Sequence, residues 1–396
     1  MSGTLAEVLR LGGPAYVRTH ELSTAQARAW RAICACRTPV LGGQQLACAA
    51  CGHSHWHYHS CRNRHCPRCG ARAKDAWLRG RLAEVLDVPY AHLVFTLPHE
   101  LGSLYRARPR WLIETLFASV AGTLRDFAAN ARWMGIAGGQ GAFSLVLHTW
   151  RQDLGQHLHL HAVMACGVLG GDGLWHVPAR QADFLFPVRA LSRVFRGRFM
   201  QALSRLAQQG EVPGDANLSQ AGRKRLYRHD WVVYAKTPLG GPAQVLDYLS
   251  RYSHRTAIGH ERIRQVSAQE VVFTVRADAH GGKRRVRLAT EEFIRRLLLH
   301  VLPKGIQRIR HYGVLANGCK KTQLAQARAA LQQPPPSPLA LESAQAFMQR
   351  VAAKAVHTCP QCRRPLQVVA SRPGARHLPA PGRECAHTPA ARGPPP

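Results

Sequence analysis

Acidic residues are scarce in this sequence. Its 396 residues include 22 Asp and Glu against 54 Lys and Arg, a formal net charge of +32 at pH 7. Because so large a positive excess repels itself unless a polyanion compensates it, the composition indicates an anionic partner. The sequence also lacks a run of about eighteen apolar residues and a lipidation signal, so we expect nucleic acid rather than a membrane.

Several other common signals are missing. The sequence has no Gly-rich phosphate loop of the GxxxxGK type and no Ser/His/Asp triad signature. Its start, MSGTLAEVLRLGGPAY, does not combine a basic flank, an apolar stretch and a cleavage site, so we expect a cytoplasmic protein. The twelve cysteines would stay reduced there, and their CxxC pairs favour metal binding over disulfides.

Apolar periodicity predicts a mixture of strands and helices. The segment Gly171-Asp172-Gly173 is typical of a hairpin turn. Strands are expected at 92–97, 143–150, 157–169, 271–276 and 284–288 and from Trp231, and helices at 76–86, 110–132, 191–208 and 243–252. Strands mixed with unequally spaced helices predict an α+β fold.

Two CxxC pairs have the spacing of a zinc site. Cys48 and Cys51 are separated by fourteen residues from Cys66 and Cys69. Each CxxC turn points two sulfurs at one ion, so we expect these four thiolates to hold a structural zinc ion. Three further candidates, which either complete a second site or replace one of the four, are Cys36, Cys61 and His65.

A third CxxC, formed by Cys359 and Cys362, lies in a Pro-rich stretch near the C-terminus. The composition of this stretch predicts a flexible tail, so the pair is weaker evidence of zinc than the first two. The side chains available to complete a site in the tail are His357, Cys385 and His387.

Three histidines alternate with apolar residues between His157 and His161. On a strand, His157, His159 and His161 share one face, while Leu158 and Leu160 share the other. Three imidazoles on one face of an apolar strand are costly to bury without a metal or an anion. We therefore expect a divalent ion there, suited to polarising a phosphate oxygen.

Two tyrosines follow Pro242 at helical spacing. Pro242 suits the first turn of a helix, and Tyr248 and Tyr252 then share one face. Taken alone, tyrosines at this spacing are more often packing residues. The positive side chains beside them, able to hold phosphates and favour the phenolate, are Arg251, His254 and Arg255.

Five segments carry a family resemblance that covers the chain from about residue 22 to residue 331. They are SCRNRHCPRCGARAK, VFTLPHEL, QHLHLHAV, GGPAQVLDYLSRYSHRTAIGHERI and LPKGIQRIRHYGVLANGCKK. On these segments the sequence resembles the insertion sequence 91 family of rolling-circle transposases, members of the HUH endonuclease superfamily. The resemblance implies an HUH palm, an antiparallel sheet with the histidines at its centre and helices around it.

The resemblance also implies roles for individual residues. His159 and His161 become the paired metal ligands, Tyr248 and Tyr252 the nucleophiles, and His157 a further candidate ligand. The implied reaction cuts and rejoins single-stranded DNA at the element ends and target through a 5′-phosphotyrosine, with Mg²⁺ or Mn²⁺ as the catalytic ion.

Basic side chains near these motifs are expected to contact DNA phosphates. They are Arg62, Arg64, Arg68, Arg251, His254, Arg255, Arg308, Arg310 and His311. The expected regions are 1–75, a helical lead-in with the zinc-binding domain; 76–290, the catalytic domain; 291–333, a basic helical DNA-binding region; and 334–396, the flexible tail.

Three other functions remain open. A replication initiator or relaxase-like nickase uses the same chemistry, although the zinc segment and the RHYGVLAN block favour a transposase. In a non-catalytic zinc-finger DNA-binding protein, the tyrosines and histidines would be structural. A metal-dependent hydrolase would need carboxylates beside the histidines, where the sequence offers Asp153 and Asp172. The oligomeric state is not indicated.

Overall fold

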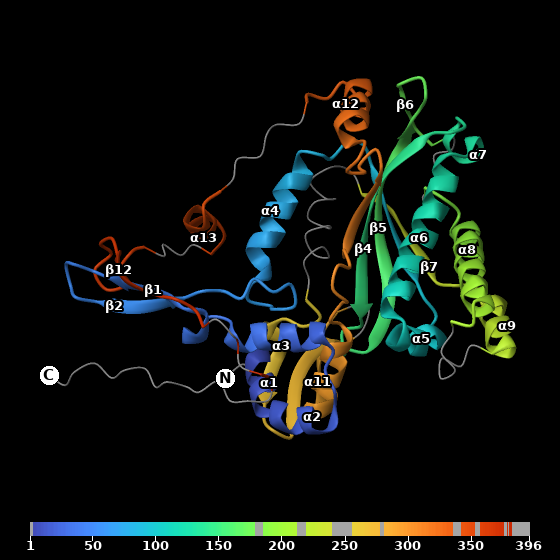
Figure 1. The fold of residues 1–396 in the computed structure, drawn as a ribbon. Helices are drawn as coiled ribbons and strands as arrows, with labels where there is room; N and C mark the ends of the chain where they lie inside the picture. The colour runs from blue at the N-terminus through green and yellow to red at the C-terminus, as the bar shows by residue number, and fades with distance from the viewer. Residues whose placement is uncertain are drawn as a thin grey trace.

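The structure is a computed structural model in three regions: a central sheet with its helices, a lobe of helices and strands below it, and a small sheet to one side (Figure 1). The described residues are 3–178, 185–211, 219–239, 256–277, 281–335, 342–352, 357–375, 378, 380 and 381.

The central sheet has six antiparallel strands in the order β11-β4-β5-β3-β7, with β6 pairing β5. They are β3 (Tyr90–Thr96), β4 (Gln140–Trp150), β5 (Gln156–Leu169), β6 (Trp175–His176), β7 (Val233–Leu239) and β11 (Ile309–Gly313). The expected Gly171-Asp172-Gly173 hairpin is confirmed between β5 and β6. The histidine strand β5 lies between β4 and β3, which confirms an α+β fold with this strand at the centre of the sheet.

Long helices cover one face of the sheet (Figure 1). Leu158 and Leu160 of β5 are buried there with Phe117 of α6 and Phe195 of α8. The strand alternation therefore turns the apolar side chains toward these helices and the histidines away from them. The helices on this side are η2 (His99–Leu101), α5 (Gly102–Ala107), α6 (Pro109–Ala128), α7 (Ala131–Met134), α8 (Val188–Gln208) and α9 (Gln220–Arg228).

The lower lobe combines the beginning of the chain with residues from its second half. Thr4 and Ser23 start α1 and α3 with capping boxes, and Val8 and Trp30 are buried in one core with Phe293. The lobe consists of α1 (Leu5–Leu11), α2 (Gly13–Thr19), α3 (Thr24–Ala35), η4 (His260–Arg262), β8 (Ile263–Val266), β9 (Glu270–Arg276), β10 (Lys283–Ala289) and α11 (Thr290–Leu299). The predicted domain boundaries at residues 75, 290 and 333 stay predictions. The core of the lobe contains residues from both sides of the first two boundaries.

The small sheet has the order β12-β1-β2 and joins two segments that are more than 300 residues apart in the sequence. Helix α4 links it to the central sheet, and α13 lies beside α4 (Figure 1). The remaining elements are η1 (Pro39–Leu41), β1 (Gly43–Ala47), β2 (Ser54–Tyr58), α4 (Gly70–Leu82), α12 (Lys320–Ala330), α13 (Ala344–Ala352) and β12 (Gln367–Arg372).

Two expectations about the second half of the chain are wrong. Residues 291–333 are not helical throughout, because β11 at Ile309–Gly313 pairs with β4 as an outer strand of the central sheet. Part of the expected flexible tail is ordered by pairing as well, since β12 binds along β1. Among the described residues, no helix is long and apolar enough to cross a membrane.

Candidate metal centre and cysteine groups

Three histidines from two neighbouring strands form a compact group. His148 of β4 lies directly opposite His159 of β5, and His161 follows two residues later on the same face. The ligand nitrogens of these three residues all lie within 4.8 Å of one another. The strand register thus brings together a third histidine, His148, that sequence reasoning did not select.

The group is shielded from solvent. His148, His159 and His161 are 4%, 9% and 7% exposed. Burial, together with a smaller contribution from the neighbouring imidazoles, lowers the pKa of His159 to about 4 and that of His161 to about 2. Both rings are therefore neutral at pH 7, with lone pairs available to a cation.

Hydrogen bonds select which nitrogen of each ring faces the group. Nδ1 of His159 lies 3.0 Å from the carbonyl oxygen of His157, and since a carbonyl only accepts, Nδ1–H is the donor. Nδ1 of His161 lies 3.1 Å from Nε2 of His92, a buried side chain of β3. Both contacts are made through Nδ1, so Nε2 is the nitrogen through which each ring would bind a metal ion, as is common where outer hydrogen bonds orient metal-binding histidines.

His157 is not part of the compact group, which corrects its expected place among the ligands. The pairing of β4 with β5 shifts between His148 and Trp150, so that β5 carries one extra residue there. A bulge of this kind re-aims the local side chain. Instead of binding the ion, His157 accepts a hydrogen bond from the ring of His159 through its backbone carbonyl.

The donor set fits a divalent ion with an open position. Three buried imidazoles on rigid strands leave room for a further ligand, the arrangement found at catalytic rather than closed structural metal sites. Among the described residues, no carboxylate joins the group. Asp153 pairs with Arg151 and Asp172 with His176, so neither supplies the carboxylate that a metal-dependent hydrolase would need.

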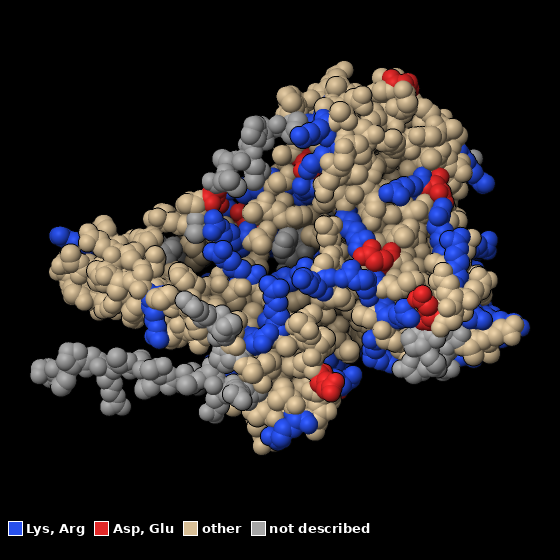
Figure 2. Space-filling view, viewed as in Figure 1, with Lys and Arg blue, Asp and Glu red and all other residues tan. Residues whose placement is uncertain are grey.

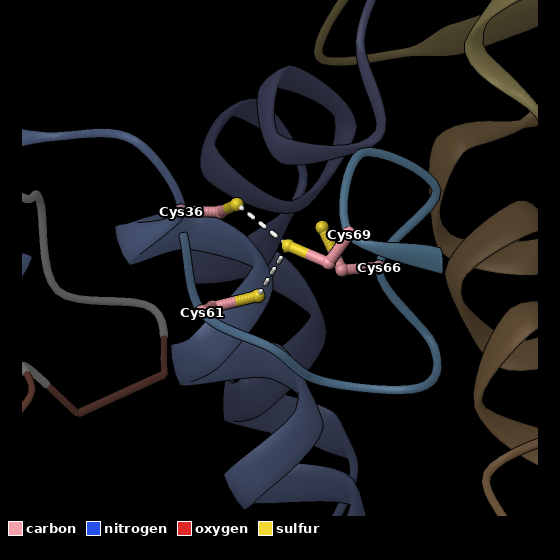
Figure 3. Close-up of side chains that lie close together, drawn as sticks. All are labelled: Cys36, Cys61, Cys66 and Cys69. Carbon is pink, nitrogen blue, oxygen red and sulfur yellow. Dashed lines mark hydrogen bonds between the residues drawn. The ribbon is translucent and has the colours of Figure 1, made fainter. Parts of the chain in front are cut away.

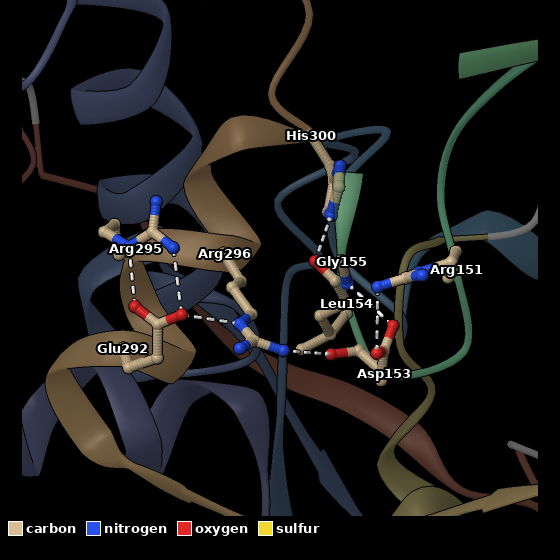
Figure 4. A network of polar contacts seen from close by, with 8 residues as sticks. All are labelled: Arg151, Asp153, Leu154, Gly155, Glu292, Arg295, Arg296 and His300. Carbon is tan, nitrogen blue, oxygen red and sulfur yellow. Dashed lines mark hydrogen bonds and ion pairs between the residues drawn. The ribbon is translucent and has the colours of Figure 1, made fainter. Parts of the chain in front are cut away.

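A polar network holds the turn that leads into β5 (Figure 4). Glu292 of α11 accepts hydrogen bonds from Arg295 and Arg296, and Arg296 also donates to the carbonyl of Asp153 at 3.2 Å. Nε2 of His300 lies 3.0 Å from the carbonyl oxygen of Leu154. Because Leu154 has a φ of +62°, a strained value for a side chain with a Cβ, these contacts stabilise the turn that sets the register of the histidine strand.

Four cysteines gather between α3 and α4. Cys36 follows α3, Cys69 precedes α4, and Cys61 and Cys66 lie in the intervening segment, with the side chains turned toward one another (Figure 3). The sulfur of Cys69 lies 3.4 Å from that of Cys36 and 3.6 Å from that of Cys61. A tetrahedral zinc with four thiolates requires sulfurs about 3.8 Å apart, far from the roughly 2.05 Å of a disulfide.

The expectation that Cys48, Cys51, Cys66 and Cys69 bind one zinc ion together is therefore wrong, because the two pairs lie in different cysteine groups. The first pair lies with Cys359 and Cys362, and the second with Cys36 and Cys61. The spacing of the two pairs permitted one site, but the first pair lies in the turn between β1 and β2, and β2 separates it from the second pair. His65 belongs to neither group; it lines a cavity with His300, where burial lowers its pKa to about 3.

Basic side chains form a band across the middle of the molecule, between the lower lobe and the sheet (Figure 2). Arg62 and Arg68, on the cysteine segment, are exposed, as expected for phosphate contacts. Arg64 is exposed too, although its guanidinium also donates to the carbonyl of Ile306 at 3.0 Å.

Three other expected DNA contacts have partners inside the protein. Arg310 forms a bidentate ion pair with Glu114. Nδ1 of His311 lies 2.7 Å from the hydroxyl oxygen of Ser144. Arg308 lies over the ring of Trp150, and its burial lowers its pKa to about 9. Because β11 pairs with β4, these residues help to build the sheet, and their contacts with DNA phosphates stay a prediction.

Tyr248 and Tyr252, with Arg251, His254 and Arg255, lie outside the described residues. Their described neighbours are Leu239, the last residue of β7, and Thr256.

Comparisons with known proteins agree on one family. The family model "Putative transposase" matches residues 141–323, and the model "Transposase zinc-binding domain" matches residues 8–97. The chain is 39% identical to "Putative transposase y4qJ" of Sinorhizobium fredii, over 90% of this chain and 92% of the relative. It is 28% identical to "Transposase for insertion sequence element IS801" of Pseudomonas savastanoi pv. phaseolicola, over 77% and 73%.

Two solved structures of the conjugative relaxase TrwC with OriT DNA also resemble this chain, both with a TM-score of 0.24. One is 21% identical and covers 29% of this chain and 44% of the relaxase; the other is 14% identical and covers 41% and 73%.

The two family models together define a transposase with a zinc-binding domain at its N-terminal end. With its relatives, the chain belongs to the insertion sequence 91 family of transposases. The zinc-binding match includes all four cysteines of the Cys36 group, which supports a structural zinc ion there.

Proposed function

We propose that this chain catalyses rolling-circle transposition by cutting and rejoining single-stranded DNA through a 5′-phosphotyrosine. The observation that carries the proposal is the buried group of His148, His159 and His161, which no carboxylate joins among the described residues. A bound Mg²⁺ or Mn²⁺ supplies polarisation of a phosphate oxygen there. Nε2 of His159 and of His161 would hold the ion, and His148 would be the third ligand.

In the cutting step, the phenolate oxygen of Tyr248 or Tyr252 attacks the scissile phosphorus. A tyrosine–phosphate bond forms, the bond from phosphorus to the 3′-oxygen breaks, and that oxygen takes up a proton. A free 3′-hydroxyl attacking the phosphotyrosine reverses the exchange and joins the strands. The number of phosphodiester-type bonds is conserved, so joining needs no nucleotide cofactor.

The described flanks of the tyrosine segment are compatible with this role. Thr256, four residues after Tyr252, lines the same cavity as Trp150. The ring of Trp150 stacks on His148, with ring centroids 4.8 Å apart. Thr256, the first described residue after the tyrosine segment, therefore shares this cavity with a side chain that contacts the histidine group.

DNA would be held mainly by charge. The net charge of +32 and the band of basic side chains in Figure 2 suit a single strand that crosses the middle of the molecule. Arg62, Arg64 and Arg68 would contact phosphates near the cysteine segment, and Arg251, His254 and Arg255 near the tyrosines. Such a protein would act on DNA in the bacterial cytoplasm.

A strand-transfer assay tests this proposal against its rivals. The protein is incubated with Mg²⁺ and two single-stranded oligonucleotides, one carrying the element end and the other the target, of different labelled lengths. We expect a recombinant strand joined from the two. A nick at the end sequence without a joined product would favour an initiator or relaxase-like nickase, and binding without cutting would favour a non-catalytic DNA-binding protein.

A further inference from the structure

The small sheet brings two CxxC turns from opposite ends of the chain to one place. In β1, Ala47 pairs with Ser54 of β2 on one side and with Gln367 of β12 on the other. Cys48 and Cys51 follow Ala47, and the turn of Cys359 and Cys362 precedes β12. Because β1 and β12 run antiparallel, both turns lie at the same end of the sheet.

The two turns have the same backbone hydrogen bonds. Cys48 donates its N–H to the carbonyl of His53 at 2.8 Å, and its own carbonyl accepts from Gly52 at 3.0 Å. In the second turn, Cys359 donates its N–H to the carbonyl of Arg364 at 2.7 Å, and the carbonyl of Cys359 accepts from the N–H of Arg363 at 2.9 Å.

The fifth residue of each turn has a positive φ, +70° for Gly52 and +61° for Arg363. Glycine adopts this conformation freely, whereas arginine needs surroundings that hold it there. The two segments therefore form a matched pair of turns, each directing two sulfurs to a common centre.

The sulfurs are placed for one ion. Sγ of Cys48 lies 3.4 Å from Sγ of Cys362, and Sγ of Cys51 lies 3.5 Å from Sγ of Cys359. All four lie within 4.8 Å of one another. These separations exceed a sulfur–sulfur bond of roughly 2.05 Å and approach the spacing of about 3.8 Å around a tetrahedral zinc ion.

The local core is too small to hold the two segments together by itself. Its buried members are Leu46, Cys48, Cys359 and Leu366. On the outer strand β12, Val368 and Val369 stay exposed. A segment with so little apolar burial needs another source of folding energy, which a tetrahedral thiolate site provides.

We propose that Cys48, Cys51, Cys359 and Cys362 bind a second structural zinc ion, which fastens the C-terminal segment 357–375 to the zinc-binding domain. Cys51 and Cys359 are 308 residues apart, so this ion closes a loop that contains the whole central sheet. Helix α13, which precedes this segment in the sequence, is also held near the zinc-binding domain, because Arg350 forms ion pairs with Asp75 of α4 and with Glu342. The ion thereby holds the segment 357–375 beside β1 and β2, on one side of the central sheet.

Zinc content per chain, measured by inductively coupled plasma mass spectrometry on the purified full chain, tests the proposal. Relative to the unchanged protein, we expect a loss of one equivalent in the Cys359→Ser, Cys362→Ser protein and in the Cys48→Ser, Cys51→Ser protein. Two controls should lose none: Cys319→Ser, outside both cysteine groups, and Cys385→Ser with His387→Ala, the alternative partners in the tail. Full zinc content in the Cys359→Ser, Cys362→Ser protein, or a loss in the tail control, would overturn the assignment.

Cobalt substitution tests the site without removing it. In the Cys362→His protein a thiolate ligand becomes an imidazole ligand, so the absorption bands of protein-bound Co²⁺ should shift while the amount of bound metal stays the same. An unchanged cobalt spectrum in this variant would overturn the proposal even if the serine variants failed to fold. Neither measurement depends on DNA cutting, so the outcome is separate from that of the proposed reaction.

Discussion

The histidine group and the Cys36 group are both suited to a metal ion, but they are built in opposite ways. His148, His159 and His161 stand on paired strands whose register is fixed by a large core on the other face. Cys36 and Cys69 lie at helix ends, and Cys61 and Cys66 lie in the irregular segment between β2 and α4. A site on a sheet that folds by itself can keep an open position for substrate, whereas a site built on loops uses all four positions to fold.

The largest expected effect comes from removing ligands on the sheet. In the His159→Ala, His161→Ala protein, we expect strand cutting to fall about a thousandfold or more, because several kcal/mol of charge stabilisation at the reacting phosphate disappear. Zinc content and the far-ultraviolet circular dichroism spectrum should stay unchanged. If the zinc of the cysteine groups were lost with the histidines, the two kinds of site would not be independent.

Removing ligands from the cysteine group should instead disrupt folding. For Cys36→Ser with Cys66→Ser, we expect the loss of one zinc equivalent and of at least about 3 kcal/mol of stability, measured by urea unfolding. Cys166→Ser, a buried cysteine outside both groups, is the control for the change of side chain. A double variant as stable as this control would show that the loops fold without the ion.

A smaller effect is expected from His92, which orients a ligand without binding the ion. The His92→Ala change removes the partner of Nδ1 of His161, so Mn²⁺ should bind about 10- to 100-fold more weakly in a calorimetric titration. His176→Ala, in the same sheet but paired with Asp172, is the matched control. Equal Mn²⁺ affinity in the two variants would contradict the orienting role.

The smallest effect concerns the turn before β5. Arg295 and then Arg296 lower the pKa of Glu292 to about 2, below its ordinary value of about 4.3. A depressed pKa contributes stability that is present above the ordinary value and is lost as the pH falls toward 2. Since these groups are partly exposed, Glu292→Gln should cost about 0.5 to 1 kcal/mol at pH 7 and less at pH 3, by urea unfolding. An equal cost at both pH values would show that the charge is not responsible.

Much of the central sheet could be predicted from sequence because its signals are local. The expected strands at 92–97, 143–150 and 157–169 correspond to β3, β4 and β5, and alternation placed His159 and His161 on one face. His148 was inside an expected strand, but a single histidine carries no signal until the register is known. A tight antiparallel pairing of 143–150 with 157–169 would have brought it opposite His159.

The cysteine partners could not be predicted because they depend on contacts distant in sequence. The spacing of Cys48, Cys51, Cys66 and Cys69 satisfied a zinc motif, yet the pairing of β1 with β12 decides which sulfurs meet. Spacing along the chain carries no information about a partner 308 residues away. The same limit explains β11, which lies in the expected basic helical region 291–333 but forms a strand because it pairs with the distant strand β4.

The central claim is covalent tyrosine chemistry beside the histidine group. The most direct measurement is a denaturing gel of the protein after incubation with labelled single-stranded DNA carrying the element end, with and without Mn²⁺, followed by mass spectrometry of the labelled peptide. We predict an Mn²⁺-dependent adduct on Tyr248 or Tyr252, which disappears in the Tyr248→Phe, Tyr252→Phe protein and in the His159→Ala, His161→Ala protein. Cut DNA without any adduct, or an adduct that persists in the double phenylalanine variant, would contradict the account.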